Sequence, residues 1–483
     1  MVKPSVWGLA VTATCFFGRT IASDPSGNIC SQNKTIGAAF ARAVNLSWPG
    51  LESAKAAAEA GDYATLCDDV AAYYRGGNTT SWLRTGSVSP STRLVGGGVD
   101  AMVFNDTFTG FPSPAGPVRM PRTADGGLNW TWYGPDDDDE FMNTFNRHYY
   151  FSELLQAWED TGNPVYPNFF QDIVLDWTLH LPCNNASSTT TGAERCVPLG
   201  TRGSSDRVCS WDDETLGGAC ATGTAESPWR SLEMGIRMPK WAEAFFGFQQ
   251  SDNFTVDARV MLLLGVSEHI QALVVDGGHP GSGTVNWEMT QWQGLLTATA
   301  AWPELTGAHN AAVTALGYLT DLLQSGVYAD GVETEMAAGY DMGTAIDYFD
   351  VLYLAHEAGP VLPEVPPAMY SRVETMYEYG AYIADPGGCL PRHGDTDHCS
   401  VGYYSNAAEF FNRSDWTYVR TNGQYGTPPS GPAHSTPSSF FDWAGQASLR
   451  SSYDANASWV FFDVGPYGSN AFHAHRDKLG GFR

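Results

Sequence analysis

The sequence predicts a mainly helical protein that ends in a short β-rich segment. Helical spacing begins near residue 140, where apolar side chains recur at i, i+3, i+4 and i+7: Phe151, Leu154, Leu155 and Trp158. The character changes near residue 425, where a Pro/Ser-rich crossing leads into a stretch rich in β-formers, Trp459 to Phe462. With 483 residues and 43% hydrophobic content, the chain can bury a large core and has room for more than one domain.

The N-terminal residues resemble a secretory leader. Lys3 precedes an apolar run, Val6–Gly18, and small residues end the segment near residue 23. We therefore expect residues 1–23 to be a signal peptide. No later run approaches 18 uninterrupted apolar residues, which predicts a protein that is secreted or reaches an endomembrane lumen and does not span a membrane.

Cysteine and sequon usage agree with export. Without Cys15 in the leader, eight cysteines remain, and an even number in a secreted chain favours disulfides. Cys389 and Cys399 are close enough to close one loop. The group from Cys183 to Cys220 looks like an insertion held by two bridges; zinc is the alternative, but no CxxC spacing supports it. The sequence has nine N-x-Ser/Thr sequons, at Asn33, Asn45, Asn78, Asn105, Asn129, Asn185, Asn253, Asn412 and Asn456, which predict a glycoprotein.

The region 24–139 is the hardest to interpret, and only parts of it, such as Glu52–Tyr63, have helical character. From 140 to about 425 the periodic pattern recurs in Leu263–Leu273 and again, more weakly, from Trp292, with stops at Gly162 and Gly326. Residues 426–483 form the predicted β segment, with strands expected at Gln446–Ser451 and Ala457–Val464.

The net charge of −27 makes nucleic acid binding very unfavourable, because the phosphate backbone needs clustered lysine and arginine. Composition alone does not reveal the oligomeric state.

Three short blocks combine glycine with residues that handle protons or carboxylates. The first is GSGTVNWEMTQWQGLL, which contains Asn286 and Trp287. The second is GVYADGVETEMAAGY, which contains Glu335 and Tyr340. The third is FHAHRDKLGGFR, the C-terminal end of the chain, whose alternating His473 and His475 would face the same side of a strand.

In order and spacing, these blocks resemble the heparinase II/III-like polysaccharide lyases, a superfamily that also holds alginate and oligoalginate lyases. The resemblance extends over roughly residues 140–483. It implies an α + β multidomain fold, in which an (α/α) toroid of helix pairs over 140–425 is followed by an antiparallel β-sandwich. Only the start of that sandwich, 426–483, is expected in this chain. The implied activity is β-elimination in a uronate polysaccharide of the alginate or glycosaminoglycan type.

The resemblance also implies roles for individual residues. Asn286 would neutralise the uronate carboxylate, Tyr340 would be the acid and for some substrates the base, and His473 would face the cleft. The only metal ligand implied is His475, for a structural zinc whose other ligands lie on further sandwich strands; the elimination itself needs no cofactor. Candidate substrate-binding residues are Arg147, His148, Arg237, Trp287, Glu335 and His393. Many relatives have His where this chain has Trp287, and Asn286 can alternatively be read as the N-cap of a helix.

Two other functions remain open at this point. A toroidal glycoside hydrolase needs two carboxylates beside the scissile bond, and four acids of the second block and its surroundings could supply them: Asp330, Glu335, Asp341 and Asp347. A non-catalytic carbohydrate-binding protein is the third interpretation, favoured by Trp287 in place of His and by the short β segment.

Overall fold

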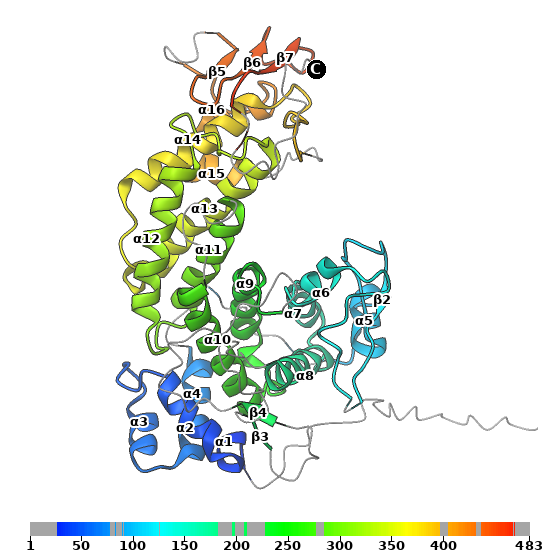
Figure 1. The fold of residues 1–483 in the computed structure, drawn as a ribbon, viewed down its shortest axis with the longest axis vertical. Helices are drawn as coiled ribbons and strands as arrows, with labels where there is room; N and C mark the ends of the chain where they lie inside the picture. Colours follow the sequence, from blue (N-terminus) through cyan, green and yellow to red (C-terminus); the bar gives the residue numbers. More distant parts are fainter. Residues whose placement is uncertain are drawn as a thin grey trace, which may run out of the picture.

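The computed structural model describes residues 27–77, 83, 89, 91–124, 126–181, 196–198, 207–209, 228–276, 285–396, 404–430, 436–466 and 468. Helices dominate these residues, and a small antiparallel sheet lies at the C-terminal end (Figure 1). The helices form a long column with the sheet at one end and a group of N-terminal helices at the other. A second group of helices extends from the column as an arm, so the molecule has a notch between the arm and the sheet-bearing end.

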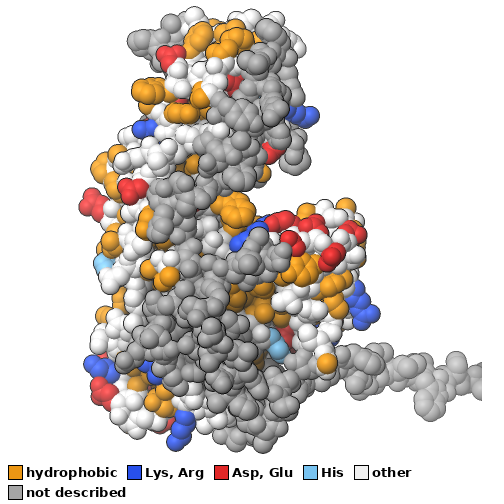
Figure 2. Space-filling model, in the orientation of Figure 1, with side chains coloured by type: hydrophobic (Ala, Val, Ile, Leu, Met, Phe, Trp, Pro, Cys, Tyr) orange, Lys and Arg blue, Asp and Glu red, His pale blue; other side chains and the backbone are white. Residues whose placement is uncertain are grey.

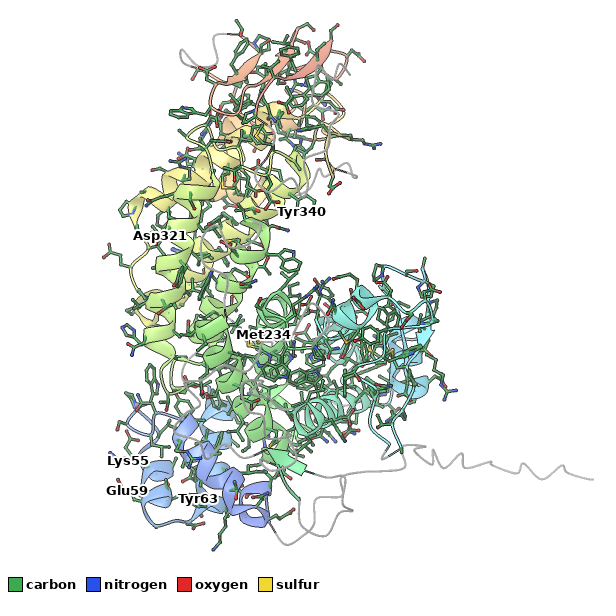
Figure 3. The ribbon with its side chains drawn as sticks, in the orientation of Figure 1. Lys55, Glu59, Tyr63, Met234, Asp321 and Tyr340 are labelled. Atoms are coloured by element: carbon green, nitrogen blue, oxygen red, sulfur yellow. A yellow bond between two sulfur atoms is a disulfide. The ribbon has the colours of Figure 1, made fainter. Side chains whose placement is uncertain are left out.

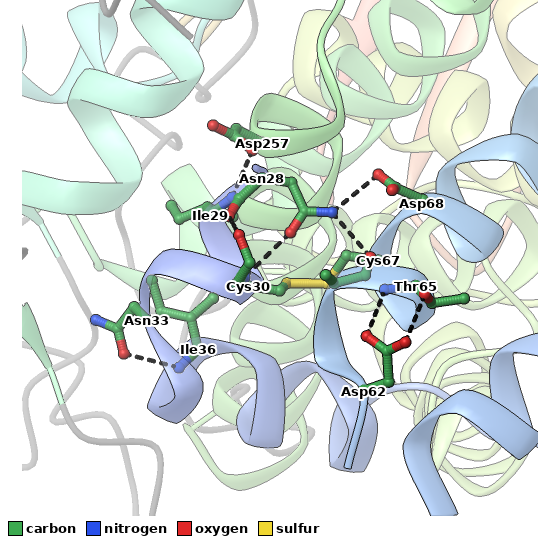
Figure 4. Close-up of a disulfide and its surroundings, with 12 residues drawn as sticks. Asn28, Ile29, Cys30, Asn33, Ile36, Asp62, Thr65, Cys67, Asp68 and Asp257 are labelled. Carbon is green, nitrogen blue, oxygen red and sulfur yellow. Dashed lines mark hydrogen bonds between the residues drawn. A yellow bond between two sulfur atoms is a disulfide. The ribbon is translucent and has the colours of Figure 1, made fainter. Parts of the chain in front are cut away.

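The N-terminal group consists of α1 Ile29–Gln32, α2 Lys34–Ala43, α3 Glu52–Glu59 and α4 Tyr63–Gly76. A disulfide between Cys30 and Cys67, with a Cα–Cα distance of 6.5 Å, fastens α1 to α4 (Figure 4). The Ile29 amide donates to the Asp257 carboxylate at 2.8 Å, so this group is also attached to the column. Cysteine spacing did not predict this pairing. Cys399 lies outside the described residues, so a Cys389–Cys399 bridge stays a prediction.

The arm and its base contain short strands and helices, of which α7 covers the helical pattern that was predicted from the sequence. Its elements are α5 Gly97–Asn105, β1 Thr107–Phe108, β2 Val118–Arg119, α6 Asp139–Phe145, α7 Tyr150–Thr161 and α8 Val165–His180. The four apolar residues that predicted a helix after residue 140 are all buried in α7. Gly162 ends that helix with φ +68°, a left-handed conformation that suits glycine.

The column begins with three long helices, α9 Ser231–Gly247, α10 Val256–Asp276 and α11 Val285–Ala301. Five more follow: α12 Ala308–Gly326, α13 Ala338–Ala358, α14 Pro367–Ile383, α15 Tyr404–Phe410 and α16 Ser414–Arg420. Single 3₁₀ turns extend α9 (η3, Phe248–Gln250) and α13 (η4, Gly359–Val361). The predicted helical stripes of α10 and α11 are buried. The buried positions include Thr299, a polar residue seven positions after Trp292, which makes the apolar pattern of α11 weaker.

One helix, α10, is long and apolar enough over Val256–Val275 to pass a membrane-span test by length and composition. However, 83% of the apolar window is buried inside the protein. In the part of the chain that the structure describes, α10 is therefore a helix of the protein core.

Helices α9 and α11 touch through their backbones at two glycines. A Cβ atom on Gly294 would lie 2.2 Å from the Gly235 carbonyl oxygen, and one on Gly235 would lie 2.5 Å from the Thr290 carbonyl oxygen. Both distances are far below van der Waals contact, so only glycine permits this approach. The contact fixes the position of the α11 N-terminus relative to α9.

The C-terminal sheet has three antiparallel strands, β5 Ser439–Phe441, β6 Gln446–Arg450 and β7 Trp459–Asp463, in that order. The two predicted strands correspond to β6 and β7, and β5 was not predicted. The sheet packs on α14, where the Tyr379 and Phe441 rings lie 4.8 Å apart edge to face. A separate two-stranded ladder pairs β3 Cys196–Pro198 with β4 Arg207–Cys209, with Cys196 opposite Cys209.

Candidate active site

The loop between α12 and α13 carries the second sequence block and is held by its own backbone. Val327 forms a β-bridge with Glu333, and the Tyr328 amide donates to the Val332 carbonyl at 2.8 Å. Gly331 has φ +91°, and a Cβ there would lie 2.3 Å from the Thr375 carbonyl oxygen on α14. Gly331 is therefore required both by its backbone conformation and by the close approach of α14.

Three carboxylates of this loop region bind backbone amides. Glu335, which is only 1% exposed, accepts a hydrogen bond from the Val285 amide at 2.5 Å. Asp341 accepts from the Glu333 amide at 2.9 Å, and Asp330 accepts from the Trp443 and Ala444 amides at 2.8 and 3.0 Å. The loop is thus fastened to α11 by Glu335 and to the sheet by Asp330.

The Glu335 contact also explains how α11 begins. Val285 is the first residue of α11, and its amide is one of the N-terminal donors that have no partner within a helix. A carboxylate at this end also interacts favourably with the helix dipole. Because α11 begins at Val285, Asn286 lies inside the first turn, and the interpretation of Asn286 as an N-cap is wrong.

Asn286 and Tyr340 both lie in the first turns of neighbouring helices. Asn286 is the second residue of α11 and Tyr340 the third of α13, and both are half-buried. One turn further along, the Thr290 hydroxyl lies 2.8 Å from the Asn286 carbonyl oxygen and 3.3 Å from Asp347 Oδ2 on α13. Tyr340 is labelled in Figure 3, close to the sheet-bearing end of the column.

The loop before α15 meets the same junction through His393 and Thr396. The Gly339 amide, next to Tyr340, donates to the Thr396 hydroxyl at 3.0 Å. His393 Nε2 lies 3.5 Å from Asp463 Oδ2 on β7, and its ring lies 5.0 Å from that of Phe461. The predicted residue His393 therefore links the helices to the sheet; its contact with substrate stays a prediction.

Trp287 is exposed beside an ion-pair network that sequence reasoning had not recognised. Its ring centroid lies 4.9 Å from the Arg230 guanidinium carbon. Arg230 and Arg147 both bind Glu140 and Glu233, with N–O distances to Glu140 of 2.8 and 3.0 Å. Basic, acidic and hydrophobic side chains meet at the inner edge of the notch (Figure 2). The signal available in the sequence was Arg230 and Glu233 at i and i+3 within WRSLEMGIR.

His148 and Arg237, two other predicted substrate-binding residues, lie fully buried. Trp241 Nε1 donates to His148 Nδ1 at 2.8 Å, and burial lowers the pKa of His148 well below its usual value. The Arg237 guanidinium lies 4.4 Å from the Trp177 ring, and burial lowers its pKa to about 9. Their observed contacts are with the protein interior, and contact with substrate stays a prediction for both.

His473 and His475 lie outside the described residues. Within the described residues, no three His, Cys, Asp or Glu side chains are arranged to hold a metal ion. The fit of a zinc ion to this chain thus depends on residues that the structure does not describe, and no chemical step is assigned to one.

The acids considered for a hydrolase are mostly engaged in structure. Asp330, Glu335 and Asp341 all accept backbone hydrogen bonds, as described above. Burial, followed by the nearby Asp350, raises the pKa of Asp347 to about 7. A hydrolase needs two carboxylates beside one bond, and among these four only Asp347 is half-buried and without a backbone-amide contact of this kind.

The model of the heparinase II/III N-terminus matches residues 39–418. The chain belongs to this family. Its curated relatives in the family include proteins named heparin-sulfate lyase. The one from Bacteroides thetaiotaomicron is 23% identical over 437 residues, which cover 85% of this chain and 55% of that protein. The one from Pedobacter heparinus is 24% identical, with 94% and 62% covered.

Solved structures of the family have the same fold. A crystal structure of heparinase III aligns with a TM-score of 0.68 at 21% identity, covering 88% of this chain and 61% of that one. The heparan sulfate lyase of Pedobacter heparinus aligns with a TM-score of 0.62, covering 92% and 63%. The predicted class, a helical toroid followed by a β domain, is confirmed. The chain spans about 55 to 64% of the length of these relatives.

Proposed function

We propose that this protein is a polysaccharide lyase that cleaves a uronate-containing, glycosaminoglycan-like polymer by β-elimination. The observation that carries the proposal is the common location of Asn286 and Tyr340. Both lie in the first turns of two helices that contact each other, and the Glu335–Val285 hydrogen bond connects the loop before Tyr340 to the start of α11. The heparin-sulfate lyases among the relatives support the choice of substrate class.

The proposed chemistry begins at the uronate carboxylate. The Asn286 amide N–H groups donate to it, which stabilises the negative charge that develops when the neighbouring C5 proton is removed. The electron pair of the C5–H bond forms a C4=C5 double bond, and the C4–O bond breaks. Tyr340 donates its proton to the departing oxygen, so one chain end is unsaturated and the other carries a hydroxyl group.

The base that removes the C5 proton is Tyr340 or His473 in this proposal. A tyrosine has an ordinary pKa of about 10, so proton removal by Tyr340 requires a coupled transfer in which its own proton moves to the leaving group. Trp287 occupies the position where many relatives have a histidine, so that side chain offers no base here.

The proposal includes secretion and a reaction without a metal ion. The Cys30–Cys67 disulfide supports an oxidising compartment, because such bonds persist there. Of the seven sequon asparagines within the described residues, four are exposed and three half-buried, and the exposed ones support the proposed glycosylation. Each elimination step above uses only protein side chains.

Ultraviolet absorbance tests the reaction, because elimination creates a double bond conjugated with the carboxylate and hydrolysis does not. We expect absorbance to rise with heparan sulfate or another uronan. Tyr340→Phe should lower turnover by at least about 10²–10⁴-fold, because it removes only the hydroxyl. Tyr353→Phe, an exposed tyrosine on the same helix, is the matched control and should leave turnover unchanged. Near-normal turnover by Tyr340→Phe, or chain shortening without absorbance, would contradict the proposal.

A further inference from the structure

Trp287 is exposed, whereas eight of the 13 tryptophans in the described part of the chain are buried. Five of the largest fully buried side chains are tryptophans, at positions 177, 241, 292, 302 and 416. Trp287, in contrast, is 38% exposed on the first turn of α11 and directly follows Asn286. Exposing a large aromatic ring to water forgoes burial of apolar surface, and this ring directly follows the candidate site residue Asn286.

The indole is held in place by Arg230. The guanidinium carbon lies 4.9 Å from the ring centroid, within the range of a cation–π contact. Arg230 is itself only 10% exposed, and its nitrogens bind Glu233 and Glu140. An exposed tryptophan normally loses rotamer freedom when it binds a ligand; a ring already fixed by a neighbour loses less.

The charges around Arg230 indicate that it acts on the ring and not on an anionic ligand. Arg230 and Arg147 share the two carboxylates Glu140 and Glu233, so two positive charges are balanced by two negative ones. Glu233 is fully buried, and removal of an arginine from it would leave a buried charge uncompensated. Arg230 is therefore not available to leave the network and bind a sulfate or carboxylate.

The two helices that carry Trp287 and Arg230 are also fixed relative to each other. Trp287 lies in the first turn of α11 and Arg230 directly precedes α9, and these helices meet at the Gly235–Gly294 contact. A shift of one helix along the other would bring backbone atoms into collision, so the geometry of the Arg230–Trp287 pair is built into the fold.

We infer that Trp287 is a sugar-stacking platform, on which the apolar C–H face of a pyranose ring packs, and that Arg230 is its positioning residue. The assignment of the neighbouring ring as the uronate held by Asn286 rests on the proposed function. At this position, where many relatives have a histidine, Trp287 offers a binding surface and not a proton-transfer group. The platform determines how a polymer is aligned with Asn286 and Tyr340.

Equilibrium binding tests the platform separately from catalysis. The probe is a heparan sulfate decasaccharide, titrated against Tyr340→Phe protein and measured by isothermal calorimetry; an alginate decasaccharide serves as the second probe. Adding Trp287→Ala should raise Kd by about tenfold, and Trp287→Phe should keep most of the affinity because it retains an aromatic face. Trp443→Ala removes another exposed tryptophan, 67% exposed beside the sheet, and should leave Kd unchanged.

Steady-state kinetics supply the second readout. They are measured on proteins that keep Tyr340 and therefore can turn over. Trp287→Ala should raise KM by a similar factor with kcat within about twofold, because stacking in the ground and transition states is alike. Arg230→Gln should also raise KM, and Arg230→Lys should restore part of the loss by keeping a cation over the ring. If Arg230 only stabilised the fold, Arg230→Gln would lower thermal stability without raising KM at a constant kcat.

Some results would overturn the inference. One is a Kd for Trp287→Ala equal to that of Trp443→Ala; another is no binding of either probe by the Tyr340→Phe protein. A fall in kcat at constant KM would show that Trp287 acts in the transition state and not as a platform. If the natural chain binds the probes through Trp287 but produces no double bond, the lyase proposal fails while the platform stands.

Discussion

At the scale of single residues, three acids around Tyr340 accept hydrogen bonds from backbone amides. Glu335, Asp330 and Asp341 each accept at least one amide hydrogen bond. A buried carboxylate that accepts such bonds recovers part of the cost of leaving water. Several of the acids that the sequence nominated as candidate site residues therefore hold neighbouring backbone segments in place.

Replacement of Glu335 tests this positioning role. Glu335→Ala leaves the buried Val285 amide without its acceptor, which should cost about 1–3 kcal/mol of stability and reduce turnover. Glu335→Gln keeps an oxygen that can accept the same bond, so it should be the milder change. Urea unfolding and the absorbance assay together measure both effects. Equal losses from Ala and Gln would mean that the negative charge matters more than the hydrogen bond.

A buried acid far from the site predicts a pH dependence of stability. Burial raises the pKa of Glu304 to about 7, while the Tyr74 hydroxyl lowers it. Since the folded-state pKa lies above the unfolded value, the protonated carboxyl of Glu304 favours the folded state. This contribution to the free energy of unfolding is complete below about pH 4.5 and is lost as pH rises through 7. The loss amounts to roughly 3 kcal/mol over this window.

Glu304→Gln, which stays neutral, should therefore remove about that much of the decline in unfolding free energy between pH 4.5 and 7.5. Urea titrations of both proteins at several pH values measure the difference. Parallel stability profiles would show that Glu304 does not carry this proton in the folded state.

At the scale of elements, some helix glycines are required by a close contact with another helix, and others are not. Gly294 in α11 contacts the Gly235 backbone, whereas a Cβ on Gly317 in α12 would meet nothing within 4 Å. Gly294→Ala should destabilise the protein by about 1–3 kcal/mol, because neither helix backbone can move aside easily. Gly317→Ala should stabilise it by about 0.5–1 kcal/mol through helix propensity. Thermal unfolding compares the pair; destabilisation of the same size in both would refute the contact argument.

Elements with strong periodicity could be predicted from the sequence, and contacts between distant segments could not. The buried stripes of α7 and α10 and the strands β6 and β7 follow from local patterns of side chains. The Cys30–Cys67 disulfide, the Asp330 contact with β5–β6 residues and the Arg230–Trp287 pair join segments that no local pattern relates. Sequence blocks could nominate Asn286 and Tyr340, but only tertiary packing brings their helices side by side.

At the scale of the whole molecule, Asp330 connects the helices to the sheet. Removal of this carboxylate in Asp330→Ala should accelerate amide exchange at Trp443 and Ala444 by at least about tenfold, because each loses its acceptor. Asp330→Asn keeps one carbonyl oxygen and should have an intermediate effect. Hydrogen exchange read by mass spectrometry measures both, with helix α10 as an internal reference that should not change. Unaltered exchange at 443 and 444 would mean that other contacts hold the sheet.

The segment from Asp330 to Tyr340 also limits how the two parts of the molecule can move. Its first residue is bonded to the sheet, Glu335 to the start of α11, and its last residue belongs to α13. Rotation of the sheet away from the helices must either break both Asp330 hydrogen bonds or pull this segment along. Any such rotation would therefore be mechanically linked to the orientation of Tyr340.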